Sequence, residues 1–156
     1  MAILSSPQVA SNISARKQEK GVFTISGEYA LEATLGSADI IRMVKIPDGV
    51  TVLKIDLSLP PALTGVSIGT QMLFNVGDGV DSNRFAESMS AFGAGNRAIG
   101  DANLTKGIQS MPYTYDFSDN DPDGFDTIDI EVIAFSGTGT AVGTLKMTAH
   151  CTADYP

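Results

Sequence analysis

The sequence predicts an all-β protein, an antiparallel β-sandwich of jelly-roll or immunoglobulin-like type that carries an extended N-terminal arm. In residues 51–59, apolar and polar side chains alternate, which indicates a strand with one buried face and one wet face. Sheets of such strands need a second layer to cover the apolar face. The rest of the chain has short strand patterns between turns rich in Gly, Pro, Asn and Asp, and no convincing helix.

Length and composition favour one domain, with residues 1–20 as the arm and 21–156 as the sandwich. The net charge of −8 and the total of only 10 Lys and Arg argue against nucleic-acid binding. The single cysteine, Cys151, excludes an internal disulfide and is compatible with assembly in the cytosol. Since the chain opens on no signal-peptide pattern and has no apolar run near the ~20 residues that span a bilayer, we expect no membrane association.

The N-terminal segment lacks the sustained periodicity of a helix or strand. It is either a frayed terminus or an arm that becomes ordered on a partner surface. The arm interpretation predicts apolar anchors and a basic run as partner-binding residues, namely Ile3, Leu4, Val9, Arg16 and Lys17.

The strands are expected at irregular intervals of about 10 residues. Gly27 is predicted to form a bulge or bend in the first, the turn Pro47-Asp48-Gly49 follows the second, and Pro60-Pro61 ends the third. The predicted strands are 22–31, 38–46, 51–59, 70–76, 82–88, 110–117, 126–135 and 141–152, with a further short strand near 97–99 inside the unpatterned stretch 89–109.

Alternation also predicts which side chains point inward. In 51–59 these are Leu53, Ile55, Leu57 and Leu59. In 126–135 the side chains expected inside are Ile128, Ile130 and Val132, and those expected outside are Asp129 and Glu131. In the last strand the side chains expected inside are Leu145, Met147, Ala149 and Cys151, and those expected outside are Lys146, Thr148 and His150.

The sequence offers no catalytic constellation. His150, the only histidine, is predicted on the outer face of the last strand, and Cys151 is predicted to be a small core residue. One His and one Cys on opposite faces of a strand do not form a zinc site. With no Gly-x-Ser-x-Gly, His-Glu-x-x-His or P-loop pattern in the chain, we expect no enzyme.

An acidic loop is the candidate metal site. Residues 119–124 read Asp-Asn-Asp-Pro-Asp-Gly and match the opening of an EF-hand calcium loop. The match stops there, because Ile130 stands where the twelfth-position Glu belongs and no helix flanks the loop. The loop is either a solvated acidic turn or a calcium or magnesium site, whose ligands are then Asp119, Asp121, Asp123 and Asp126, with Asp116 also within reach.

Residues 77–85 read Gly-Asp-Gly-Val-Asp-Ser-Asn-Arg-Phe. A phosphate-binding loop needs a following helix N-terminus, and its aspartates would repel an anion. We therefore predict a hairpin turn, pinned by pairing of Arg84 with Asp78 or Asp81.

These residues carry a resemblance. Two stretches of the sequence together resemble a pattern in the head decoration or cement proteins of tailed bacteriophages. The first is K-I-P-D-G-V-T-V-L-K-I-D-L-S-L, and F-N-V-G-D-G-V-D-S-N-R-F follows it. The resemblance covers residues 38–85 and, more loosely, 126–152. It implies a β-sandwich on the outside of an icosahedral shell, often trimeric at quasi-threefold positions, which bridges capsomers through loops and an N-terminal arm.

The resemblance implies that the chain is a structural virion protein assembled in the host cytoplasm. It also implies that the partner is the major capsid protein and that the protein is a homotrimer. We expect residues 1–20 and 89–109 to contact the shell. The alternative is a calcium-assisted carbohydrate- or receptor-binding sandwich on a virion or cell surface, since Tyr113 and Tyr115 precede the 119–126 loop and aromatic faces stack on sugars.

Overall fold

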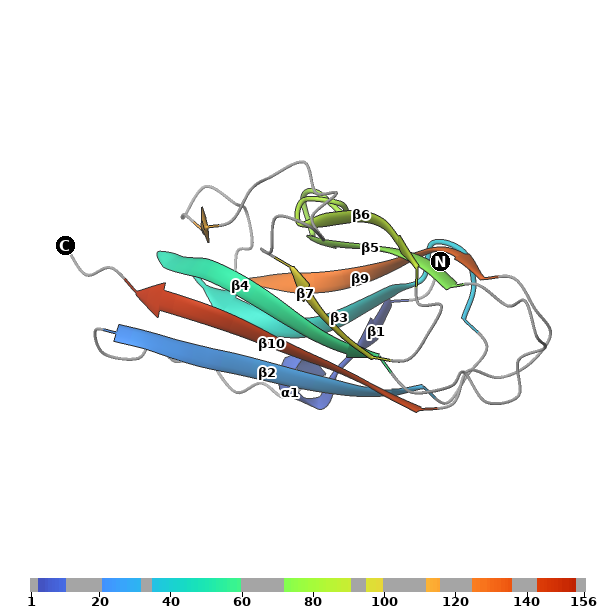
Figure 1. Ribbon diagram of the computed structural model, residues 1–156, viewed down its shortest axis with the longest axis horizontal. Coiled ribbons are helices and arrows are strands. Elements are labelled where there is room, and N and C mark those ends of the chain that lie inside the picture. The colour runs from blue at the N-terminus through green and yellow to red at the C-terminus, as the bar shows by residue number, and fades with distance from the viewer. Residues whose placement is uncertain are drawn as a thin grey trace.

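The chain forms a two-layer β-sandwich in a computed structural model. Figure 1 shows β2, β10 and β4 side by side in one layer, with β3, β9 and β5 in the other. The structure describes residues 3–10, 21–31, 35–59, 72–90, 95–99, 112–115, 125–135 and 143–153.

The first sheet has the strand order β1-β3-β9-β5-β6, in which β1 is parallel to β3 and the other neighbours are antiparallel. Its strands are β1 (Ile3–Ser5), β3 (Ile40–Pro47), β9 (Phe125–Phe135), β5 (Met72–Asp78) and β6 (Ala86–Ser90). The second sheet has the order β2-β10-β4-β7, and β8 also pairs with β4. Its strands are β2 (Gly21–Leu31), β10 (Gly143–Ala153), β4 (Val50–Leu59), β7 (Gly95–Ile99) and β8 (Tyr113–Thr114).

The predicted β-sandwich is confirmed, and each strand assigned from the sequence has a counterpart within a few residues where the structure describes it. The short strand expected near 97–99 is β7, which lies at the edge of the second sheet. The strand predicted over 110–117 is described only from 112 to 115, where it contributes the two residues of β8.

The core lies between the two sheets and follows the predicted alternation in β9 and β10. Ile128, Ile130 and Val132 are buried, and every second residue of β10 from Leu145 to Ala153 is buried with them. Removing a side chain of this size from water stabilises a fold by about 1.5–3 kcal/mol. The hydrophobic effect over this contiguous cluster therefore holds the two layers together.

One inward assignment in β4 is wrong. Leu53 is 36% exposed, whereas Val52 is fully buried. The pairing of β4 with β10 shifts at this point, since His150 pairs with Lys54 but the next residue, Cys151, pairs with Val52. Leu53 is thus the extra residue of a β-bulge, which reverses the alternation on its N-terminal side.

Gly27 does not form the predicted bulge, because the β2–β10 register runs through it without a shift. A Cβ atom at Gly27 would lie 1.9 Å from the carbonyl oxygen of Met43 in β3. The glycine is required because the backbones of β2 and β3, which belong to different sheets, approach closely here.

The predicted Pro-Asp-Gly turn is confirmed, and it carries the chain from one sheet to the other. β3 ends at Pro47, β4 begins at Val50, and Gly49 has a φ of 74°, which glycine adopts without steric cost. The Gly49 N–H donates to the Tyr115 carbonyl at 2.6 Å, and the Tyr115 N–H donates to the Val50 carbonyl at 3.0 Å.

Residues 3–10 of the predicted arm lie on the sandwich. β1 adds to the edge of the first sheet, and α1 (Pro7–Ala10) is a single helical turn. Buried Ser6 anchors this segment: its hydroxyl donates to the Met43 carbonyl at 2.6 Å and its N–H to the Arg42 carbonyl at 2.8 Å. No helix within the described ranges is long and apolar enough to cross a membrane.

Candidate interaction site around the turn after β5

The turn formed by residues 77–85, called the 77–85 turn below, is held by backbone amides that donate to one aspartate. The Asp78 Oδ1 atom accepts the N–H groups of Val80 at 3.1 Å and Asp81 at 2.9 Å. The Asp81 carbonyl accepts the N–H groups of Asp78 at 2.9 Å and Arg84 at 3.2 Å. These bonds satisfy the turn's polar groups locally, as short aspartate side chains do in Asx turns.

Gly77 allows the turn to fold back over the sheet. A Cβ atom at this position would lie 2.1 Å from the Asp81 carbonyl oxygen and 2.3 Å from the Ser82 carbonyl carbon. Any other residue would push the turn away from the outer face of the first sheet.

The predicted pairing of Arg84 is confirmed, and its partner is Asp78. The Arg84 Nε atom donates to Asp78 Oδ2, and a second guanidinium nitrogen lies 3.4 Å from Oδ1. The two side chains are only 11% and 1% exposed. Burial alone would lower the pKa of Arg84, but the Asp78 carboxylate outweighs burial and raises it, so the guanidinium stays charged.

Aromatic rings enclose this ion pair. The Arg84 guanidinium carbon lies 4.5 Å from the centre of the Tyr113 ring. Tyr113 packs edge-to-face against Tyr115, with ring centres 5.0 Å apart, and against Phe85 at 5.8 Å. The Tyr115 hydroxyl donates to Asp78 Oδ2 at 3.3 Å, and burial, together with the charges of the nearby carboxylates, places its pKa well above the ordinary value.

The suggestion that Tyr115 presents a sugar-stacking face is wrong, because this ring is 1% exposed and packed inside the cluster. Tyr113 is half-buried, and the Arg84 guanidinium lies over its ring.

A cavity of about 240 Å³, called the outer pocket below, lies between the 77–85 turn and the outer face of the first sheet. In register, Asp129 of β9 lies between Arg42 of β3 and Gly77 of β5. The wall that the turn contributes includes Val80, which is 61% exposed. Other lining residues are Ile40, Ser82 and Glu131.

Asp129 faces outward as predicted, yet it is only 5% exposed. The 77–85 turn folds over this part of the sheet, which pattern analysis of β9 alone does not reveal. Thr127 hydrogen bonds with the carboxyl group, while Oδ1 has no hydrogen-bond partner among the described residues. Burial, reinforced by the charges of Asp126 and Asp78, raises the pKa of Asp129 to about 7.

A second hollow, of about 320 Å³, adjoins the outer pocket at Glu131. Its rim includes Ala38 and Ser88, whose φ angles of 70° and 52° are uncommon for residues other than glycine. Asn75 bridges the hollow, since its Nδ2 donates to Glu131 Oε2 at 2.9 Å and its Oδ1 accepts the Ser88 N–H at 3.0 Å.

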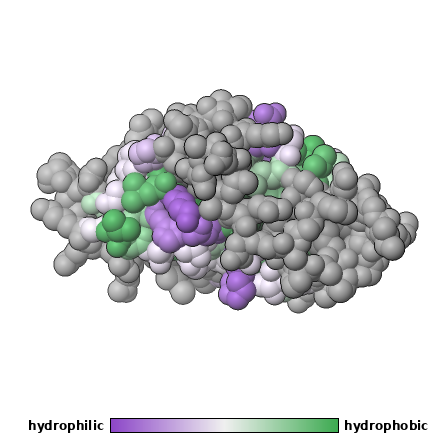
Figure 2. Space-filling view, in the orientation of Figure 1, coloured by the Kyte–Doolittle hydropathy of each residue, from purple (hydrophilic) through white to green (hydrophobic). Residues whose placement is uncertain are grey.

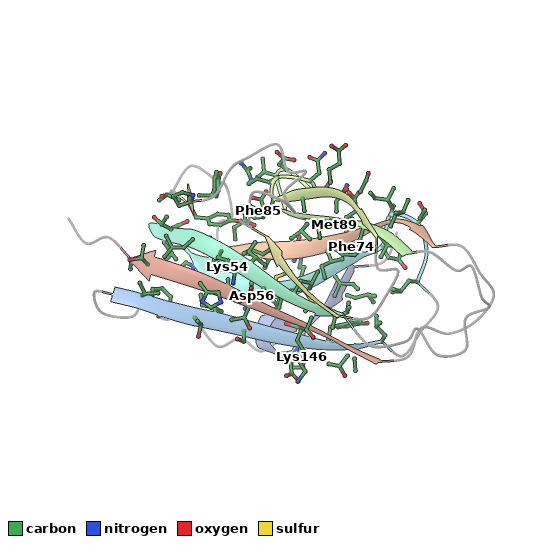
Figure 3. All side chains as sticks on the ribbon, viewed as in Figure 1. Lys54, Asp56, Phe74, Phe85, Met89 and Lys146 are labelled. Carbon is green, nitrogen blue, oxygen red and sulfur yellow. The ribbon has the colours of Figure 1, made fainter. Side chains whose placement is uncertain are left out.

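The outer face of the second sheet carries a separate polar group. Asp56 accepts a hydrogen bond from Lys54 at 2.8 Å (Figure 3). The Asp56 carboxylate also lies 2.7 Å from His150 Nε2. Burial would raise the pKa of Asp56, but these two partners lower it overall. Figure 2 views this side and shows hydrophilic side chains next to hydrophobic ones, and exposed Val22 and Leu53 belong to this sheet.

His150 lies on the outer face as predicted, and no hydroxyl of a described residue is hydrogen bonded to its ring. The nearby Ser26 and Thr148 hydroxyls bond to each other at 2.9 Å. Cys151 is buried as predicted, and burial raises the pKa of its thiol to about 12. Neither residue is arranged as a nucleophile–base pair.

The predicted metal ligands Asp119, Asp121 and Asp123 lie outside the described residues. Asp126 is described and is 8% exposed, and its Oδ1 accepts the Thr127 N–H at 2.7 Å. The described ranges contain no group of three or more His, Cys, Asp or Glu side chains placed to hold a metal ion. The metal site at this loop therefore stays a prediction.

Of the predicted partner-binding residues, three are described. Ile3 is 52% exposed, while Leu4 and Val9 are partly buried, and Leu4 packs against the core. Arg16 and Lys17 lie outside the described residues. The described part of the segment thus leaves one of its three predicted apolar anchors largely in solvent.

Comparison with known proteins gives a likeness of fold. No family model and no curated protein sequence matches the chain. A chain of the cyanophage Pam1 capsid asymmetric unit matches with a TM-score of 0.62 and 16% identity, over 94% of this chain and 96% of that chain. A chain of the capsid of Ralstonia phage GP4 matches with a TM-score of 0.69 and 13% identity, over 99% and 100%. The resemblance to phage head proteins is therefore confirmed at the level of the fold.

Proposed function

We propose that this protein is a structural component of a tailed-phage head, a decoration or cement protein that binds the outside of the shell and stabilises contacts between capsomers. The observation that carries the proposal is the whole-chain fold likeness to chains of two phage capsid structures. The alignments cover 96% and 100% of those chains, so the likeness is to complete capsid components rather than to one domain of a larger chain.

Such a protein acts by mass action. A protein that binds the assembled shell more tightly than its separate capsomers stabilises the assembly by the difference in binding free energy. Specific interfaces of this kind bury about 1,200–2,000 Å². The partner in this proposal is the major capsid protein, and a homotrimer would add avidity on a shell with matching local symmetry.

The proposal places the protein on the outer surface of virions assembled in the host cytoplasm, with no catalytic role. The calcium-assisted recognition module has less support. Its proposed aromatic platform includes Tyr115, which is buried, and three of its four proposed calcium ligands lie outside the described residues.

Co-sedimentation with purified phage shells that lack this protein tests the proposal. We expect saturable pelleting at a fixed number of copies per capsomer, and competition by excess unlabelled protein. Shells that already carry a full complement are the matched control and should pellet none. If the protein stays in the supernatant at tens of micromolar with both kinds of shell, it is not a decoration protein for that head.

A further inference from the structure

We propose that the outer pocket binds a cationic side chain, lysine or arginine, from a neighbouring protein of the shell, with Val80 as the apolar contact beside it. The identity of the neighbour as a shell protein rests on the proposed function, whereas the cation-binding property belongs to the pocket itself.

The first reason is an unsatisfied acceptor. The Asp129 carboxyl group lines the pocket and is 5% exposed, yet its Oδ1 receives no hydrogen bond from any residue that the structure describes. A buried acceptor without a donor is unfavourable, because it has lost water and gained nothing in exchange. A donor that enters through the pocket would remove this cost.

The second reason is charge. Glu131 lies two residues beyond Asp129 on the same face of β9, roughly 7 Å along the strand. Asp78 also lines the pocket and is already paired with Arg84, so the Arg84 charge is not available to Asp129. Arg42 lies opposite Asp129 in register and also lines the pocket. It is exposed and forms no ion pair within 4 Å with Asp129 in the described part of the chain, although its charge acts to lower the pKa of Asp129. Asp129 and Glu131 set two carboxyl groups against the one exposed guanidinium of Arg42, so the pocket suits a cation with several N–H donors.

The third reason is preorganisation. The Asp78 carboxylate holds the N–H groups of Val80 and Asp81, and the ion pair with Arg84 holds the carboxylate in turn. Val80 is thus an exposed apolar side chain on a turn whose backbone is already bonded in place. Because the backbone of the turn is already held, little conformational entropy remains to be lost when Val80 packs against a partner.

A side chain fits these observations better than a metal ion. No three metal-ligating side chains are brought together in the described ranges, and Glu131 already accepts a hydrogen bond from Asn75 at 2.9 Å. A lysine or arginine needs only one buried carboxylate and a second negative charge nearby.

The pocket can be tested without any shell. N-acetyl-arginine amide, its lysine analogue and the neutral citrulline analogue are titrated into the isolated protein at pH 8 while backbone amide NMR shifts are followed. We expect saturable shifts at Val80, Asp129 and Glu131 with one or both cationic probes, none with citrulline, and none with either cation in Asp129→Asn. Absence of shifts with both cations, or equal shifts with citrulline, overturns the proposal.

The role in the shell is tested by the pelleting assay. Asp129→Asn should weaken shell binding at least tenfold, while Glu28→Gln, which removes one exposed carboxylate from the second sheet, should bind as the wild type does. If the wild type does not pellet, the proposed function fails while the probe titration still decides the pocket. If the wild type and Asp129→Asn pellet equally, the pocket is not part of the shell contact.

Discussion

Arg84 and Asp78 form a buried ion pair under the turn that connects β5 to β6, and both residues belong to the Gly-Asp-Gly-Val-Asp-Ser-Asn-Arg-Phe motif of residues 77–85. The motif residues serve one structure: Asp78 binds the turn amides, Asp81 closes the turn, Arg84 neutralises Asp78, and Phe85 enters the core. These residues therefore specify a turn that is held by its own side chains.

Arg84→Met should destabilise the fold by about 3–5 kcal/mol, because it leaves the Asp78 carboxylate buried without its countercharge. Urea unfolding followed by circular dichroism at pH 7.5 measures this change.

The matched control for this substitution is Lys146→Met, which breaks the exposed ion pair with Glu28 and should cost about 0–1 kcal/mol. Equal losses in the two variants would show that the Arg84 pair is as solvent-screened as a surface pair.

Asp129→Asn should flatten the dependence of stability on pH. The pKa of Asp129 rises from 3.8 to about 7 on folding, so between these values the folded state holds a proton that the unfolded state has released. Stability therefore falls as pH rises from about 4 to about 7, by up to ~4 kcal/mol at the upper end. The variant should equal the wild type near pH 4 and exceed it at pH 8.

Unfolding free energies at pH 4, 6 and 8 check this prediction. An unchanged pH slope in the variant would mean that Asp129 titrates in the fold as it does in the unfolded chain. Since the same substitution is expected to weaken binding, Asp129 would be a residue that lowers stability in exchange for an interaction.

Gly27→Ala should destabilise the sandwich by about 1–3 kcal/mol or more, because the new methyl group would overlap the Met43 carbonyl and force β2 away from β3. Gly36→Ala is the control, since its Cβ would meet only Asp39 at an ordinary 3.4 Å, and it should change stability by less than about 0.5 kcal/mol. Thermal melts of both variants distinguish them, and a wild-type melt for Gly27→Ala would contradict the close approach.

Cys151 should react with Ellman's reagent only as the protein unfolds. The thiol is fully buried and its pKa is raised to about 12, so the thiolate fraction at pH 8 is about 1 in 10,000. The labelling rate in increasing urea should follow the unfolded fraction. Complete labelling within minutes in the absence of urea would place the thiol at the surface.

Pattern analysis could predict much of the candidate site. The turn motif predicted that Arg84 pairs with Asp78 or Asp81, of which the structure selects Asp78, and alternation predicted the outer position of His150. The burial of Asp129 could not be predicted in this way. Its own strand, Thr-Ile-Asp-Ile-Glu, has the pattern of an ordinary outward aspartate, and the turn that covers it comes from residues about fifty positions earlier.

The sequence by itself determined the strands, the turns and the two-layer class of this protein, because alternation, glycine and proline act over a few residues. Only the tertiary structure decided the bulge that exposes Leu53, the close approach at Gly27 and the cover over Asp129. Each of these depends on which strands are neighbours and in what register. A strand's own pattern says which face is buried, but the register also depends on which strand it pairs with and on where bulges fall.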